Sequence, residues 1–133
     1  MMTDLEKAKE FFTADRYATE LTGIEIVAVG DRYAKCRLET SGIHQNAVGH
    51  VMGGVFFTLA DFTFAVAANH NATAPTVTVT STISYLTVPS DNVLLAEAHV
   101  LRDGKRNCFY EIRITDGQEN LVATVNTTGA HLS

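Results

Sequence analysis

Residues Gly53–Ala68, which read GGVFFTLADFTFAVAA, decide the fold of this chain. Thr58, Asp61 and Thr63 are the only polar residues among them, and Asp61 is the only formal charge over residues 40–90. At about 3.6 residues per turn the apolar side chains cover every side, so we expect a helix that is buried all round. An ionised carboxylate in such a helix is costly unless it is paired or hydrated. We therefore interpret Asp61 as a catalytic carboxylate; the alternative is a buried Asp bonded to nearby backbone groups or hydroxyls.

The composition indicates a single domain over residues 1–133. Hydrophobic residues make up 46% of the chain and charged residues 19%, which is usual for a globular protein. The net charge is −5 and the Lys and Arg residues form no cluster, so nucleic acid is not an expected partner. The sequence has neither a run of the roughly 18 apolar residues that span a membrane nor the apolar core of a signal peptide. We expect a cytoplasmic protein with no membrane partner.

The two cysteines and five histidines are not spaced like metal ligands. Cys36 and Cys108 lie in separate strand-like runs without CxxC spacing, so we expect reduced structural thiols. The histidines form neither an HxxxH motif nor a Cys/His ligand pattern. The sequence therefore predicts no metal and no cofactor.

The remaining segments predict an α+β fold. Helical patterns, alternating β-branched runs and turn residues predict two short helices (5–12 and 16–21), a hairpin (24–28 with 33–39), a long strand (77–88) and a three-strand antiparallel meander (93–101, 108–115 and 121–130). An Asp-Gly pair in each of the last two turns is a strong hairpin signal. An antiparallel sheet needs one face covered, and an apolar helix needs cover on every side. We therefore expect a curved antiparallel sheet wrapped around one long buried helix.

The start of the central helix has the features of an oxyanion hole. Gly53 and Gly54 expose backbone N–H groups that no residue inside the helix can satisfy, and without Cβ atoms they allow a substrate oxygen to approach. The Asn46 side-chain amide, in the preceding loop, is a candidate second donor. The alternatives are close helix–strand packing for the glycines and a loop residue that caps its own backbone for Asn46.

The spacing of these groups has a geometric consequence. Gly53 and Asp61 are eight positions apart in the sequence, which is about 12 Å along a helix axis. A donor at Gly53 and a base at Asp61 of one chain therefore cannot reach the same carbonyl. If both act on one substrate, they belong to two subunits related by a two-fold axis, and function requires at least a dimer.

At these residues the sequence resembles the hotdog-fold acyl-CoA thioesterases of the phenylacetate-degradation type, within the 4-hydroxybenzoyl-CoA thioesterase superfamily. The family pattern is Asn-x-x-Gly-x-x-His-Gly-Gly, then six residues and a carboxylate usually preceded by Leu-Ala. The chain fits it at Asn46, Gly49, Gly53, Gly54 and Leu59–Asp61. The resemblance extends over nearly the whole chain, with further matches at Gly23, Tyr85, Pro89, Gly104–Arg106 and Leu121–Ala123.

The resemblance implies a hydrolase whose substrate carries coenzyme A, so no separate cofactor is implied. Asn46 and the Gly53 amide would polarise the thioester carbonyl, and Asp61 from the partner subunit would act as general base on water or as nucleophile. Thr78, with Thr80 as a substitute, takes the position of a hydroxyl that helps to hold the water.

The resemblance also implies a substrate-binding surface and an obligate homo-oligomer, either a dimer or a dimer of dimers. Gly54 lies beside the oxyanion donor. Lys105 and Arg106 lie where such proteins meet the phosphates of coenzyme A, although an ordinary solvated turn explains this pair equally well.

One departure from the family pattern concerns Met52, which stands where the family usually has His. Met cannot donate a strong hydrogen bond, so either a lower activity or a different substrate class follows if that His orients the carbonyl. His50, two positions earlier, is a candidate replacement, or a plain loop residue.

Several functions remain open at this level. We expect a thioesterase that acts on an aryl- or medium-chain acyl-CoA, and a non-catalytic acyl-CoA or aromatic-ligand binder is the alternative function. A hotdog hydratase is disfavoured because the central helix has no His.

Overall fold

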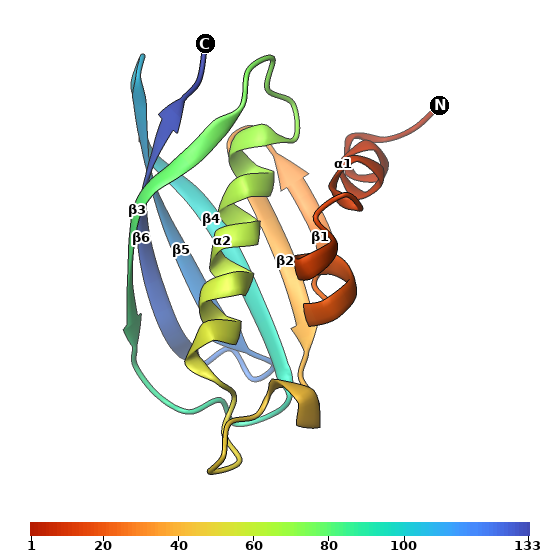
Figure 1. Ribbon diagram of the computed structural model, residues 1–133, viewed down its shortest axis with the longest axis vertical. Helices are drawn as coiled ribbons and strands as arrows, with labels where there is room; N and C mark the ends of the chain where they lie inside the picture. Colours follow the sequence, from red (N-terminus) through yellow and green to blue (C-terminus); the bar gives the residue numbers. More distant parts are fainter.

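Six antiparallel strands form one curved sheet, and the long helix α2 lies across one face of it (Figure 1). The computed structural model describes all of residues 1–133. Its elements are α1 (Asp4–Phe12), a π-helical turn (Tyr17–Thr22), β1 (Glu25–Gly30), β2 (Tyr33–Glu39), a 3₁₀ turn (Gly42–His44), α2 (Gly53–Asn69), β3 (Thr76–Tyr85), β4 (Val93–Asp103), β5 (Asn107–Asp116) and β6 (Leu121–His131). The expected α+β architecture is confirmed.

The strand order is β1-β2-β4-β5-β6-β3, and every neighbouring pair is antiparallel. The predicted hairpin is β1–β2, and the predicted meander is β4–β5–β6. Helix α2 connects β2 to β3 and so carries the chain from one side of the sheet to its far edge (Figure 1). None of the helices has the length and apolar character needed to cross a bilayer.

The N-terminal segment closes one flank of α2. Thr3 and Glu6 form a reciprocal capping box at the start of α1. Phe12, at the end of α1, packs edge-to-face on Phe62 of α2 with ring centroids 5.8 Å apart. The following helical turn ends at Gly23, whose φ of 90° places it in the left-handed region that favours glycine.

The apolar side of α2 packs on alternating residues of the strands. Phe64 meets Tyr110 of β5 edge-to-face, with ring centroids 5.1 Å apart. Both side chains are almost fully buried, as are Leu59 and Val66 of α2. The sheet and this side of the helix therefore share one core.

The prediction that α2 is buried all round is wrong for the single chain. Gly54, Phe57 and Asp61 are exposed and form one stripe along the helix. The sheet covers α2 from one side only, so this stripe has no second layer over it. The carboxylate of Asp61 is therefore at the protomer surface. Within one chain it carries no cost of burial that would mark it as catalytic.

The strand predicted over 77–88 is shorter than expected, because β3 ends at Tyr85. The N–H groups of Leu86 and Thr87 both donate to the Val122 carbonyl, at 2.9 and 3.4 Å, which ends the regular alternation of the ladder. The segment from Leu86 to Pro89 then leaves the sheet and passes near the start of α2.

Candidate active site

A buried histidine fixes the loop that leads into α2. His44 Nδ1 accepts the Ser41 N–H at 3.0 Å, so its Nε2 carries the proton and donates to the Thr22 carbonyl at 2.7 Å. The His44 carbonyl in turn accepts the Met52 N–H at 2.9 Å. His44 therefore holds both ends of the loop. Sequence reasoning missed this role, because Thr22 is distant in the sequence and no local pattern marks the contact.

Asn46 shapes the loop with its side-chain oxygen. Asn46 Oδ1 accepts the N–H groups of Val48 and His50, each at 3.1 Å, and Gly49 between them has a φ of 85°. These two bonds orient the amide, so Nδ2 points away from them and has no acceptor in the chain. Asn46 can therefore fill both roles considered for it. Its side-chain oxygen caps the loop backbone, and its NH₂ group is free to donate to a ligand.

The first two N–H groups of α2, from Gly53 and Gly54, find no acceptor within the chain, and Met52 provides no side-chain cap. Tyr85, at the end of β3, donates its hydroxyl to the Gly53 carbonyl at 2.9 Å. A Cβ atom on Gly53 would lie 2.9 Å from this hydroxyl oxygen, so the close approach requires glycine at this position. Sequence reasoning missed this direct contact of Tyr85.

Asn46, His50 and Gly53 line one cavity of about 380 Å³. Its other walls are Val51, Phe56, Tyr85 and the segment Leu86–Pro89. A cavity that has aromatic and aliphatic walls and also contains the free Asn46 amide and Gly53 N–H suits an apolar group attached to a carbonyl. The arrangement can bind a carbonyl oxygen and stabilise negative charge that develops on it.

The structure separates His50 from Met52. His50 lines the cavity with Asn46 and Gly53, whereas Met52 is exposed and lines a different hollow together with Gly54 and Thr58. His50, and not Met52, therefore lies in the same cavity as Asn46 and Gly53.

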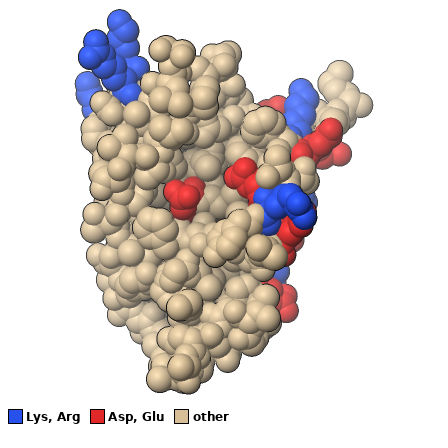
Figure 2. Space-filling model, viewed as in Figure 1, with Lys and Arg blue, Asp and Glu red and all other residues tan.

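Asp61 lies elsewhere on α2. Its Oδ1 accepts the Thr78 hydroxyl at 3.2 Å, whereas Thr80, two residues further along β3, makes no such bond. Asp61 shares a hollow with Asp15, whose pKa is raised by its burial and by the nearby charge of Asp61. Figure 2 shows the face over α2, where a few acidic groups lie in a surface that is otherwise almost free of charge.

The cavity with Gly53 and the hollow with Asp61 have no lining residue in common. The helical rise places the two residues about 12 Å apart along α2. The structure therefore brings together Asn46, His50 and Gly53, and separately Asp61 and Thr78, within one chain.

Lys105 and Arg106 are exposed and lie on the turn between β4 and β5, at the end of the molecule where α2 terminates (Figure 1). The Arg106 carbonyl accepts the His131 N–H at 2.9 Å, next to the start of β3. Because α2 has 17 residues, this end lies about 25 Å from Gly53. Within one chain these cations do not reach the cavity.

Comparison with known proteins identifies the fold and its family. A family model described as "Thioesterase superfamily" matches residues 48–123, a range that includes Gly53, Asp61 and Thr78. The acyl-coenzyme A thioesterase PaaI of Escherichia coli strain K12 is 30% identical over 119 residues, which cover 89% of this chain and 84% of that protein.

Solved structures agree with this assignment. A conserved protein of Pseudomonas aeruginosa is 32% identical with a TM-score of 0.81, over 86% of this chain and 92% of that one. The E. coli PaaI protein superposes with a TM-score of 0.86 at 24% identity, over 98% of this chain and 97% of that one. A hypothetical thioesterase protein of Streptococcus pneumoniae, solved with coenzyme A, has a TM-score of 0.83 at 20% identity, over 92% and 97% of the two chains.

A curved antiparallel sheet packed on one long helix, with free amides at the helix start, defines a hotdog-fold thioesterase. This chain belongs to the thioesterase superfamily and is a thioester hydrolase of the PaaI type. The resemblance found in the sequence is thereby confirmed.

Proposed function

We propose that this chain hydrolyses an aryl- or medium-chain acyl-CoA thioester in a site formed between two subunits. The main support for a site between subunits is that the free Gly53 N–H and Asp61 line different hollows of one chain. The E. coli relative is described as an acyl-coenzyme A thioesterase, and the S. pneumoniae structure contains coenzyme A, which supports this substrate class.

In this proposal the carbonyl oxygen of the substrate accepts hydrogen bonds from the Gly53 N–H and the Asn46 amide. The positive end of the α2 dipole adds favourable potential. Gly54 lines the neighbouring hollow with Met52 and not the cavity itself. The acyl group occupies the cavity walled by Phe56 and the aromatic ring of Tyr85. His50 lies beside the carbonyl. Met52 is placed on the opposite side of the helix start, so its replacement of the family's His leaves the donors of this cavity in place.

Asp61 of the partner subunit completes the reaction, either as general base or as nucleophile. As a base it takes a proton from water, while the water oxygen attacks the carbonyl carbon. The C–S bond then breaks and coenzyme A leaves as its thiolate, which accepts a proton. Because a thiolate is a good leaving group, the reaction needs no strong general acid, metal or cofactor. Thr78 holds the carboxylate through its hydroxyl.

An edge strand supports the dimer that this site requires. Strand β3 lies at the edge of the sheet, is ten residues long and carries no charged residue. Its Val77 and Val79 are exposed. A long uncharged edge with free backbone groups is a ready template for a second copy of the chain. The exposed stripe of α2 lies next to this edge and would face the partner.

Lys105 and Arg106 fit the same arrangement. Both residues lie near the C-terminal end of α2, remote from Gly53. Asp61, at the middle of the same helix, is closer to them than Gly53 is. In an antiparallel dimer the subunit that provides Asp61 would therefore also bring these two cations toward the phosphates of coenzyme A.

The test is thiol release from a panel of aryl-, short- and long-chain acyl-CoA thioesters, with wild type beside Asp61→Ala. Turnover that disappears in the variant supports the proposal, and the panel identifies the acyl class. Saturable binding without turnover for every thioester would instead support the acyl-CoA binder that the Met52 departure suggests.

Subunit complementation tests the shared site directly. Chains with Asn46→Ala and chains with Asp61→Asn are each expected to be nearly inactive. If they are mixed, unfolded and refolded together, half of the dimers are hybrids with one intact site, which restores about a quarter of wild-type activity. Activity no greater than the mean of the two parents would refute a site between subunits.

A further inference from the structure

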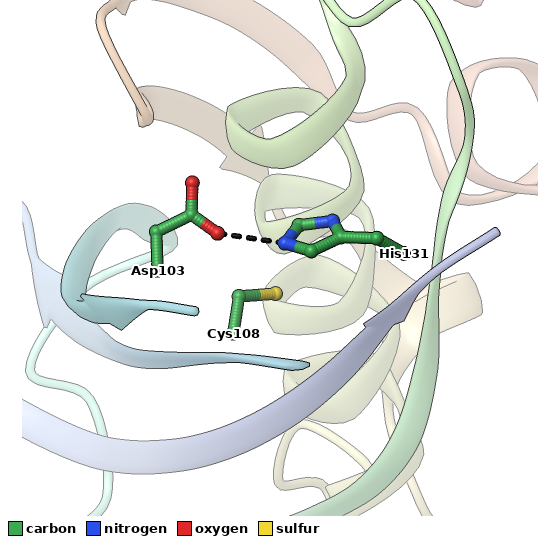
Figure 3. Close-up of side chains that lie close together, drawn as sticks. All are labelled: Asp103, Cys108 and His131. Carbon is green, nitrogen blue, oxygen red and sulfur yellow. Dashed lines mark hydrogen bonds and ion pairs between the residues drawn. The ribbon is translucent and has the colours of Figure 1, made fainter. Parts of the chain in front are cut away.

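Three side chains from three adjacent strands converge at the end of the sheet near the C-terminus of α2, remote from Gly53 of the same chain. Asp103 ends β4, Cys108 lies at the start of β5 and His131 ends β6. One ligand atom from each lies within 4.8 Å of the other two (Figure 3). Local sequence spacing predicts no metal site, because these residues meet only through the strand pairing.

The strand register explains the convergence. Asp103 and Cys108 are direct cross-strand partners, and Cys108 faces Gly129 on β6. His131 lies two residues beyond Gly129, so its side chain is on the same face of the sheet. A Cβ at Gly129 would lie 2.8 Å from Cys108 Sγ, so glycine here leaves room for the sulfur.

Each ligand candidate is held by a second partner. His131 Nδ1 is bonded to the Thr76 hydroxyl at 2.7 Å, which directs Nε2 toward Asp103 Oδ1 at 2.7 Å. Arg32 Nε donates to the other oxygen, Asp103 Oδ2, at 2.6 Å, and so fixes the carboxylate. Metal-binding histidines and carboxylates in proteins are typically oriented by such outer partners.

We propose that Asp103, Cys108 and His131 bind one Zn²⁺ ion that ties the ends of β4, β5 and β6 together. Thiolate, imidazole and carboxylate are the ligand types of zinc sites. Tetrahedral zinc needs ligand atoms about 3.3–3.6 Å apart, so Nε2 and Oδ1 must separate by roughly 0.6–0.9 Å and the sulfur must move inward. The adjoining cavity of about 410 Å³ is lined by Asp103, His131 and Thr76, so two of the three ligand candidates and a water as fourth ligand are reached from it, whereas Cys108 is buried behind them.

The charges are compatible with this ion. A Cys108 thiolate and the Asp103 carboxylate neutralise Zn²⁺, and Arg32 is bonded to the carboxylate oxygen that faces away from His131. The thiol proton is released to solvent on binding. The site lies about 25 Å from Gly53 of the same chain along the direction of α2, and its three ligand candidates come from the ends of three strands, so we assign it a structural role.

The experiment uses the full chain, reduced and freed of metal with a chelator, and titrates it with Zn²⁺ and with Co²⁺. We expect one Zn²⁺ per chain and, with Co²⁺, a sulfur-to-cobalt charge-transfer band that reports thiolate coordination. Cys108→Ala should abolish the band and weaken Zn²⁺ binding by more than about 100-fold. Thr76→Val, which removes only the outer partner of His131, should weaken binding by about 10-fold.

Cys36→Ala is the matched control, because Cys36 is an equally buried free thiol in β2, away from the cluster. It should keep the charge-transfer band and full Zn²⁺ affinity. Absence of the band in the folded wild type would overturn the proposal, as would a band that persists in Cys108→Ala. If Cys108→Ala fails to fold, His131→Gln provides the same comparison, and the wild-type spectrum decides alone.

Discussion

Gly53→Ala would place a methyl carbon 2.9 Å from Tyr85 Oη and 3.2 Å from Tyr85 Cζ. Real Cβ contacts are not this short, so the tyrosine ring or the first turn of α2 must move. Displacement of Tyr85 also breaks its hydrogen bond to the Gly53 carbonyl, which is 2.9 Å long. The substitution therefore perturbs both the first turn of α2 and the position of the free Gly53 N–H group.

The expected magnitude follows from three contributions. Overpacking costs about 1–3 kcal/mol, the lost hydrogen bond costs about 1 kcal/mol, and replacing glycine by alanine in a helix returns about 0.5–1 kcal/mol. The net loss in the free energy of unfolding is therefore about 2 kcal/mol. Because the Gly53 N–H is displaced and not removed, we expect kcat/KM to fall by about 10- to 100-fold, less than for loss of an oxyanion donor.

The assay is urea denaturation followed by circular dichroism, at several fixed protein concentrations because a dimer's stability depends on concentration. Tyr85→Phe and the double variant complete a double-mutant cycle. Without the hydroxyl the nearest atom is Cζ at 3.2 Å, so a shift of a few tenths of an ångström relieves the contact. The two substitutions should therefore couple by about 1 kcal/mol. A Gly53→Ala protein as stable and as active as wild type would show that the contact between Gly53 and Tyr85 does not constrain the start of α2.

Three further outcomes are expected. Hydrogen bonds, of which that from the Ser90 N–H has the largest effect, hold the pKa of the buried Asp116 carboxyl well below its ordinary value. The ionised Asp116 therefore stabilises the folded protein above about pH 4, and this contribution is lost as pH falls toward the pKa of Asp116 in the folded state. Asp116→Asn should lower the free energy of unfolding at pH 7 and flatten its fall in acid, and an unchanged acid limb in urea titrations would contradict this. Burial raises the pKa of Cys36 to about 12 and also raises that of Cys108; an aromatic disulfide at pH 8 should therefore modify both thiols slowly in the native protein and rapidly in urea, and fast native modification would be inconsistent with their burial. Thr78→Val removes the hydroxyl that bonds Asp61, so kcat/KM should fall by about 10-fold with little change in stability, and full activity would exclude a positioning role.

The main elements of the fold could be predicted from the sequence because their signals are local. The apolar run of α2 requires only a helical period, and the Asp-Gly pairs require only turn geometry. Gly53 and Asp61 are identified as candidate site residues from the start of the helix and from the single charge within it, and their spacing with Asn46 carries the resemblance to the family. The separation of Gly53 from Asp61 is a property of helical rise, and it is therefore already present in the sequence.

Other properties depend on contacts between residues that are distant in the chain. The exposure of Asp61 depends on the sheet covering α2 from one side only, which a helical pattern does not reveal. The position of His50 inside the cavity and of Met52 outside it depends on how Asn46 folds the loop. The predicted end of β3 at Val88 is wrong because the hydrogen-bonded ladder with β6 ends three residues earlier, at Tyr85.

The tertiary structure alone also brought Asp103, Cys108 and His131 together, since strand register, and not sequence spacing, sets which side chains share one face. The helices, the turns and the residue types available for chemistry follow from the sequence alone, because backbone preferences and hydrophobic periods act over a few residues. Which of those side chains meet, and which face solvent, was decided by packing, where the closest neighbours come from separate strands.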